Sequence, residues 1–240
     1  MPTPKSALGC TDCATRPACL LNLLSDEETR AIQPYIERRR FHHGDRISTE
    51  GELSRFVRLL KIGDAFSYRR GLDGQERPIG IAGRGTACGL FGYFGQPNQV
   101  SEIAATSLRV CEITHENLRR VAATNAALSE HLTSVAASGC GLIAAWSEGM
   151  RVRGLVNQLA YALVLLSQAH RSNIINLPTH TALAELLGTT RETIARAFAT
   201  LKTEGGLQLL ERRKCSIDRE MLLGRLRRRG AGAASETAEP

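Results

Sequence analysis

Three cysteines lie within ten residues near the start of the chain, at Cys10, Cys13 and Cys19. Thiolates bind zinc and iron–sulfur clusters, whereas disulfides rarely persist in a reducing cytoplasm. The sequence contains 7 cysteines, an odd number that disulfide pairing would leave with an unpaired thiol. The crowding of the first three therefore predicts a metal site rather than a disulfide framework.

A second group of reactive side chains lies near the other end, at Arg191, Glu192 and Arg196. Arginine can donate two hydrogen bonds to guanine, and a carboxylate can accept one from cytosine. An arginine in the first turn of a helix opposes the helix dipole, so Arg191 needs another reason to be there. Residues 191–230 hold eleven Lys and Arg against five Asp and Glu, which is +6 of the net +7. Although basic runs are often only solvated surface, this one predicts contact with a polyanion.

The residues around Arg191 predict a helix-turn-helix over about 179–201. Thr179 fits the cap of a first helix that Gly188 ends, and Thr190 fits the cap of a second helix. Ala184 is small where the two helices must cross. We therefore expect the second helix to present its polar face to DNA.

Two short apolar runs, 207–210 and 215–217, are expected to form the strands of a wing. Arg212, Arg213 and Lys214 lie at the turn between them and suit phosphate contacts that position the protein without reading sequence. The predicted DNA-binding residues comprise the helix caps, the exposed helix face and the wing: Thr179, His180, Thr190, Arg191, Glu192, Ala195, Arg196 and Lys214.

The N-terminal half has a different sequence pattern. Ser25 and Glu28 fit a capping box and predict a helix that ends near Pro34. From about 41 to 113, short apolar runs alternate with glycine-containing turn signals. This pattern predicts an antiparallel barrel or jelly roll.

A long helix is expected between the two halves, over about 125–150. It carries apolar or small residues at heptad spacing, and these are the predicted dimer interface: Leu128, Leu132, Val135, Gly139, Leu142 and Trp146. The same stripe also fits packing on the chain's own barrel, but Gly139 permits close helix approach and favours the dimer. A further apolar helix over about 154–169 is expected to form the core of a second domain.

These elements give an α+β protein with five parts. We expect a cysteine-rich sensor loop, a β-roll sensor domain, a dimerisation helix, a winged helix-turn-helix domain and a disordered tail, at 1–24, 25–124, 125–152, 153–224 and 225–240. Neither a membrane span nor a secretory signal is present, which predicts a cytoplasmic protein without membrane contact. The sequence has no Walker loop and no dinucleotide fingerprint, so we do not expect an enzyme.

This order of parts resembles the CRP/FNR family of bacterial transcription regulators, from Cys10 to about Leu223. The most specific stretch is 187–196, LGTTRETIAR. The resemblance implies a homodimer that binds palindromic double-stranded DNA, with RNA polymerase as a further partner. It implies that Glu192 and Arg196 read a G·C pair and a guanine. Arg191 matches an arginine of the cyclic-AMP receptor branch, which shifts the expected half-site from TTGAT toward TGTGA.

The two branches of the family imply different sensors. The cyclic-nucleotide branch uses a glutamate and an Arg-Ser pair, where this chain has Cys88, Asn98 and Gln99. Without a cation for the cyclic phosphate, cyclic AMP is not expected. The FNR branch holds a [4Fe–4S] cluster with three N-terminal cysteines and one distant cysteine. The matching residues are Cys10, Cys13, Cys19 and Cys111, with Cys88 as the reserve for the fourth position.

The resemblance therefore implies a regulator that responds to oxygen or nitric oxide through a cluster that controls dimerisation. Four thiolates could also hold zinc, which has no redox chemistry with which to sense a gas. Two other functions remain open. One is a ligand- or nucleotide-gated regulator whose cysteines are incidental. The other is an iron–sulfur redox protein, which would not need the exposed face of Arg191, Glu192 and Arg196.

Overall fold

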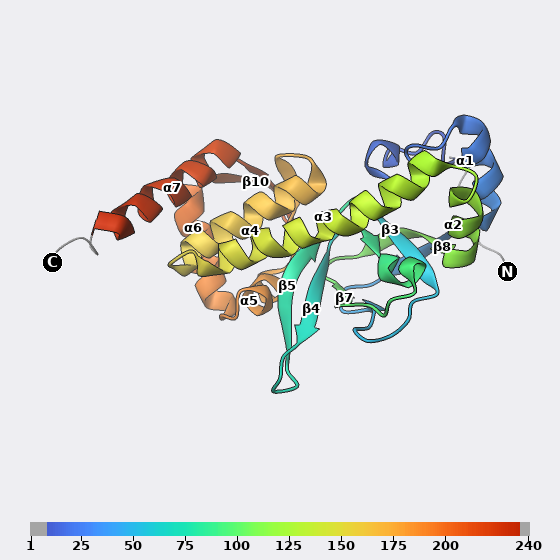
Figure 1. Ribbon diagram of the computed structural model, residues 1–240. Coiled ribbons are helices and arrows are strands. Elements are labelled where there is room, and N and C mark those ends of the chain that lie inside the picture. The colour runs from blue at the N-terminus through green and yellow to red at the C-terminus, as the bar shows by residue number, and fades with distance from the viewer. Residues whose placement is uncertain (1–8, 236–240) are drawn as a thin grey trace.

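The computed structural model describes residues 9–235, which form a β-roll, one long helix and a C-terminal helical domain (Figure 1). The chain enters through a loop that contains η1 (Arg16–Ala18), then α1 (Asp26–Ile32) and η2 (Gln33–Tyr35). The predicted capping box is confirmed. Ser25 Oγ accepts from the Glu28 N–H at 3.2 Å, and the Glu28 carboxylate accepts from the Ser25 N–H at 2.8 Å.

The β-roll consists of two four-stranded antiparallel sheets, which confirms the predicted barrel-like architecture. The first sheet has the order β1 (Glu37–Phe41), β8 (Leu108–Thr114), β3 (Phe56–Ile62) and β6 (Ala87–Cys88). The second has the order β2 (Arg46–Ser48), β7 (Ser101–Ala104), β4 (Ala65–Arg70) and β5 (Glu76–Ala82). A short helix, η3 (Leu90–Phe94), follows β6. In the register of the first sheet, Cys111 on β8 lies opposite Arg38 on β1 and Leu59 on β3.

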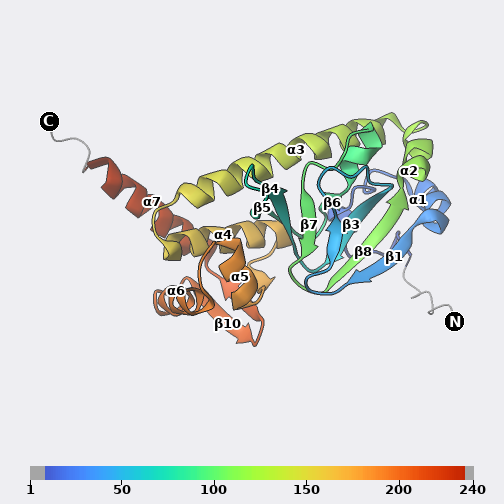
Figure 2. The same cartoon turned by 90° about the horizontal axis from the view of Figure 1, so that it is seen from below.

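After α2 (His115–Ala122), the long helix α3 (Ala126–Arg151) runs from the β-roll to the C-terminal domain (Figures 1 and 2). Its predicted apolar stripe is divided between two environments. Leu128, Leu132 and Trp146 are buried within their own chain, and the Trp146 indole N–H donates to Pro78 O at 3.2 Å. The prediction that these three form a dimer interface was therefore wrong, because the β-roll and the C-terminal domain already cover them.

The other members of the stripe are more accessible. Val135 is half-buried against the β-roll, and Leu142 is 50% exposed. A Cβ added to Gly139 would meet no atom within 4 Å. The middle of α3, residues 137–144, is thus the segment that remains open to a partner.

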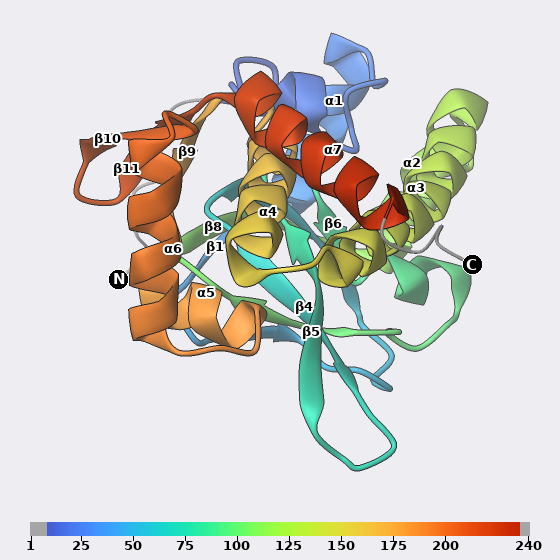
Figure 3. The same cartoon turned by 90° about the vertical axis from the view of Figure 1, so that its left-hand side faces the viewer.

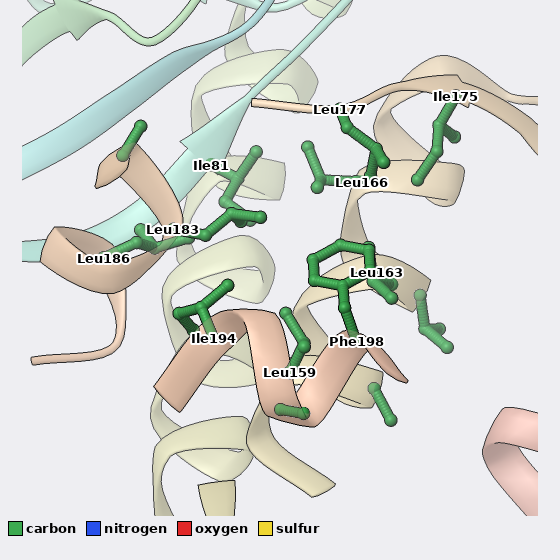
Figure 4. Close-up of a cluster of buried hydrophobic side chains, with 14 of the residues drawn as sticks. Ile81, Leu159, Leu163, Leu166, Ile175, Leu177, Leu183, Leu186, Ile194 and Phe198 are labelled. Atoms are coloured by element: carbon green, nitrogen blue, oxygen red, sulfur yellow. The ribbon is translucent and has the colours of Figure 1, made fainter. Parts of the chain in front are cut away.

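The C-terminal domain contains α4 (Leu155–His170), β9 (Ile174–Asn176), α5 (His180–Leu186), α6 (Arg191–Thr203), β10 (Leu207–Glu211), β11 (Lys214–Ile217) and α7 (Arg219–Ser235). The strands form a sheet in the order β10-β11-β9, seen beside α6 in Figure 3. Figure 4 shows how Leu159 and Leu163 of α4 pack against Ile194 and Phe198 of α6, with Ile81 of the β-roll nearby. One continuous core therefore joins the two domains.

The tail predicted to be disordered from 225 onward is helical as far as Ser235, so that prediction was wrong for 225–235. Arg225 Nε donates to Asn157 Oδ1 at 2.8 Å, and its guanidinium pairs with Glu204, so both α4 and α6 hold the first turns of α7. Residues 1–8 and 236–240 lie outside the described residues. Within the described part of the chain, no helix combines the length and apolar character needed to cross a bilayer.

Candidate functional site

The predicted helix-turn-helix is built by α5 and α6. Thr179 Oγ1 accepts from the Ala182 N–H at 3.0 Å, and Thr190 Oγ1 accepts from the Thr193 N–H at 3.2 Å, so both predicted caps are present. Gly188, between the helices, has a φ of +61°, which glycine adopts without strain. The caps and this turn fix where α6 begins and how it crosses α5.

The two faces of α6 differ as the sequence predicts. Ile194 and Leu201 are completely buried. On the other side Arg191, Glu192, Ala195 and Arg196 are all exposed. Arg196 makes one weak contact, from Nη2 to Thr193 Oγ1 at 3.3 Å, so little holds it back from a base. The exposed face also includes Thr200, one turn further along, which the sequence analysis did not single out.

Two predicted DNA-binding residues are placed less favourably. The His180 ring stacks on Phe198 with 5.0 Å between ring centroids, and partial burial, followed by the charge of Arg191, lowers its pKa. The His180 ring therefore packs on Phe198, a buried residue of α6, and not on the exposed face of that helix. Lys214 is the first residue of β11 and pairs with Glu211 at 3.3 Å.

Of the four cysteines expected to act together, three lie in the N-terminal loop and the fourth, Cys111, lies on β8, where it packs against the same hydrophobic core as Cys19. The pKa of the Cys19 thiol is raised to about 11, mainly by burial and also by the negative charge of Cys111, Cys13 and Cys10 when ionised, although a hydrogen bond from the Leu21 N–H opposes the rise. Burial also raises the pKa of Cys111, to which Cys10 and Cys13 contribute in the same way. This mutual effect links thiols that lie up to about a hundred positions apart in sequence.

Positively charged side chains influence the ionisation of these thiols. Although burial opposes it, hydrogen bonding by Thr15 and the charge of Lys61 lower the pKa of Cys13. Lys61 and Arg38 also favour the thiolates of Cys10 and Cys111. These cations come from β3 and β1, the strands on either side of β8. The sequence analysis missed them, since only strand pairing brings them to Cys111.

Cys88, the reserve candidate, belongs to a different environment. It is fully buried, and its pKa is raised well above the usual value by burial and by the neighbouring Glu102 carboxyl. Ser48 donates a hydrogen bond to the same carboxyl. No N-terminal cysteine influences Cys88, so this thiol forms part of a polar network inside the β-roll.

The donor set at the four-thiol region fits a cluster. All four cysteines are free thiols, as an all-cysteine cluster requires, and the neighbouring cations match the negative charge of a cluster with four thiolate ligands. Within residues 9–235, no three cysteine, histidine or acidic side chains converge closely enough to hold a single metal ion.

A cavity of about 410 Å³ lies between the β-roll, α3 and the N-terminal loop. Asn98 and Gln99 are in its wall, at the positions expected to lack a phosphate-binding cation, and donate to Thr49 O and Pro97 O. Arg84 and Arg171 also line it, but their guanidinium groups donate to backbone carbonyls of the loop. The cavity thus has a wall of amides where a cyclic phosphate would require a cation.

Comparisons with known proteins agree with both halves of the fold. The profile of the Crp-like helix-turn-helix domain matches residues 157–230, and that of the cyclic nucleotide-binding domain matches residues 38–125. The cyclic AMP receptor protein of Thermus thermophilus is 24% identical over 210 residues, which cover 85% of this chain and 97% of the relative.

Two solved structures show the same fold. FixK2 from Bradyrhizobium japonicum has a TM-score of 0.62 at 21% identity, covering 79% of this chain and 96% of that one. A mutant of CooA from Carboxydothermus hydrogenoformans has a TM-score of 0.60 at 18% identity, covering 87% and 95%.

A β-roll joined by one long helix to a winged helix-turn-helix defines a class of DNA-binding regulators. With one matched domain of each kind joined by α3, the chain is a DNA-binding transcription regulator of the CRP/FNR type, a class of regulators rather than of enzymes.

Proposed function

We propose that this regulator responds to oxygen or nitric oxide through a [4Fe–4S] cluster held by Cys10, Cys13, Cys19 and Cys111. The observation that carries the proposal is that Cys19 of the N-terminal loop and Cys111 of β8 pack against one hydrophobic core, while all four free thiols are electrostatically coupled. A cluster bound there would supply sensitivity to oxidants. The chain itself supplies four thiolates and their charge compensation, and it ties the N-terminal loop to β8.

The loop has a defined position even though it contains little regular structure. Arg16 Nη1 donates to Thr29 Oγ1 at 2.9 Å and its Nη2 donates to Leu24 O at 2.6 Å. The backbone N–H of Cys10 donates to Gln33 Oε1 at 2.9 Å. These bonds hold the cysteine loop against α1, so that ligation requires little additional ordering of the chain.

The regulator acts as a homodimer in this proposal, with the open middle of α3 as the contact between copies. Residues 134–145 contain no charged side chain, and Leu142 and Ile143 are about half exposed. Gly139 and Gly141 permit close approach of a second helix. A two-fold dimer would place two copies of α6 about 34 Å apart, one turn of DNA, which suits a palindromic site. RNA polymerase would then be a partner of the DNA-bound dimer.

The test is an anaerobic visible spectrum of the full chain together with iron and sulfide assays. Wild type and Cys88→Ala should contain about four irons per chain and show a broad visible absorbance that bleaches in air. Cys111→Ala should lose most of the iron. A Cys111→Ala protein with wild-type iron and absorbance, or a wild type without iron and sulfide, would refute the proposal.

A second function is supported by the cavity beside α3. Its volume of about 410 Å³ is in the range of small-molecule sites, and the buried Asn98 Oδ1 has no partner among the described residues. An effector that donates a hydrogen bond would satisfy that oxygen. Titration calorimetry with cyclic AMP distinguishes the two functions. We expect no heat of binding, and saturable binding at one site per chain would favour the nucleotide-gated alternative.

A further inference from the structure

The turn between β5 and β6 consists of Gly83, Arg84 and Gly85, here called the junction turn. It lies between the cysteine loop, residues 9–24, and the last turn of α4, which belongs to the DNA-binding domain. Both neighbours approach it so closely that glycine is required on each side. The proposed function does not use this contact.

On one side the junction turn holds the cysteine loop. Gly85 has a φ of +90°, and a Cβ there would lie 2.4 Å from Ala18 O. The Arg84 guanidinium donates to Ala14 O. The loop backbone therefore rests directly on the turn, between Cys13 and Cys19.

On the other side the turn meets the end of α4. A Cβ on Gly83 would lie 2.6 Å from the Ala169 Cβ, well inside normal contact. The next residue of α4, His170, pairs through Nε2 with Asp64 Oδ1 at 2.8 Å, and the Asp64 side chain is fully buried. Arg171 then adopts a φ of +50°, which is rare for a residue other than glycine, and donates to Pro17 O at 3.4 Å.

The cysteine loop, the junction turn and the end of α4 are therefore in close van der Waals contact. Packed interiors switch between discrete arrangements and do not stretch, so a shift of the loop must move the turn, α4 or both. The same α4 carries Leu159 and Leu163 into the core that positions α6. The contact of Gly83 with Ala169 therefore lies on a path from the cysteine loop to the recognition helix, beside the direct bond from Arg171 to Pro17 O.

We propose that the junction turn couples the cysteine loop to the DNA-binding domain within one protomer. The signal then reaches α6 through α4, in addition to any change in dimerisation. The proposed function enters this coupling at one point only, because it names the event that displaces the cysteine loop. The mechanical contact is independent of what the cysteines bind.

The first experiment needs no cluster. Hydrogen exchange is measured for the amides of residues 167–171 in the reduced, metal-free full chain. In Gly85→Ala the added Cβ meets Ala18 of the loop, and we expect the change to raise exchange at the end of α4 by at least about fivefold. Gly74→Ala is the matched control, because Gly74 has a φ of +78° but no atom within 4 Å of an added Cβ. Faster exchange confined to the loop, or equal effects of the two variants at α4, would overturn the coupling.

The second experiment measures DNA affinity with the thiol site filled and emptied, on a duplex that the wild-type protein selects from a random pool. We expect Gly83→Ala to reduce the ratio of the two Kd values by at least about fivefold, with dimer mass and visible absorbance unchanged. Adding Ala169→Gly removes the clashing methyl group and should restore the ratio. A wild-type ratio in Gly83→Ala, or no recovery in the double variant, refutes the coupling. A wild type without a chromophore would refute the proposed function, and the exchange experiment would still decide the coupling.

Discussion

Replacing His170 with alanine removes the partner of a buried carboxylate. Asp64 Oδ1 lies 2.8 Å from His170 Nε2, and Asp64 Oδ2 has no partner among the described residues. Breaking a buried ion pair by deleting one member costs about 3–5 kcal/mol. The His170 side chain is 14% exposed, so water can enter the vacated space, and we expect a loss near the lower end, about 3 kcal/mol.

Urea unfolding measures this loss as a midpoint shift of about 1 M, for a slope near 3 kcal/mol per M. Asp64→Asn keeps an acceptor but removes the charge, so it should cost only about 1 kcal/mol. Combining Asp64→Asn with His170→Ala should cost less than the sum of the single changes. A loss below about 1 kcal/mol for His170→Ala would show that Asp64 does not depend on this partner.

The same pair predicts a dependence on pH. Burial alone lowers the pKa of His170, but the hydrogen bond and charge of Asp64 outweigh burial and hold the pKa above 6.5, while Arg84 opposes them. A raised folded-state pKa stabilises the protein fully below the unfolded value and loses its effect as pH rises through the folded value. The stability difference between wild type and His170→Ala should therefore shrink as pH rises from below about 6.5 through the raised folded-state pKa. A difference that grows over this range would contradict the reasoning.

Two further substitutions test the DNA-reading face and the long helix. Arg196→Ala should weaken binding to the selected duplex by about 1–3 kcal/mol and relax specificity at one base pair, measured by fluorescence anisotropy. The exposed Lys202 serves as the control, and equal losses for Arg196→Ala and Lys202→Ala would refute the assignment. Leu132→Ala, at a fully buried site, should lower unfolding free energy by about 2–5 kcal/mol, whereas Leu142→Ala should reduce dimer mass in sedimentation with little effect on the fold. The reverse pattern would show that the two faces of α3 were misassigned.

The helix-turn-helix could be predicted from sequence because its signals are local. Thr190 caps α6, Gly188 supplies the left-handed turn, and the spacing of Ile194 and Leu201 marks the buried face. By contrast, β9 has only three residues, too few for a periodic pattern. It forms because β11 pairs with it.

The α3 stripe shows where periodicity reaches its limit. Heptad spacing identifies an apolar face but not the surface that covers it. Leu128 and Leu132 pack on the β-roll, whereas Leu142 is half exposed. The prediction of a disordered tail failed in α7 for a similar reason. The arginine-rich composition of this segment does not reveal that Arg225 bonds to Asn157 and Glu204.

The thiol site lies between these cases. Cysteine spacing and family resemblance predicted Cys10, Cys13, Cys19 and Cys111, and the structure brings their thiols into mutual influence. The metal at the site stays a prediction. Lys61 and Arg38 could not be predicted as neighbours of these thiols, because their positions depend on the register of β1, β8 and β3.

The most direct test of the central claim is DNA affinity measured without oxygen and then in air. Wild type should lose at least about tenfold in affinity on exposure to air, and Cys88→Ala, which removes a thiol outside the four-thiol site, should do the same. Cys111→Ala should bind weakly and equally under both conditions. Oxygen-sensitive binding by Cys111→Ala that matches wild type would contradict control of DNA binding by the four thiols.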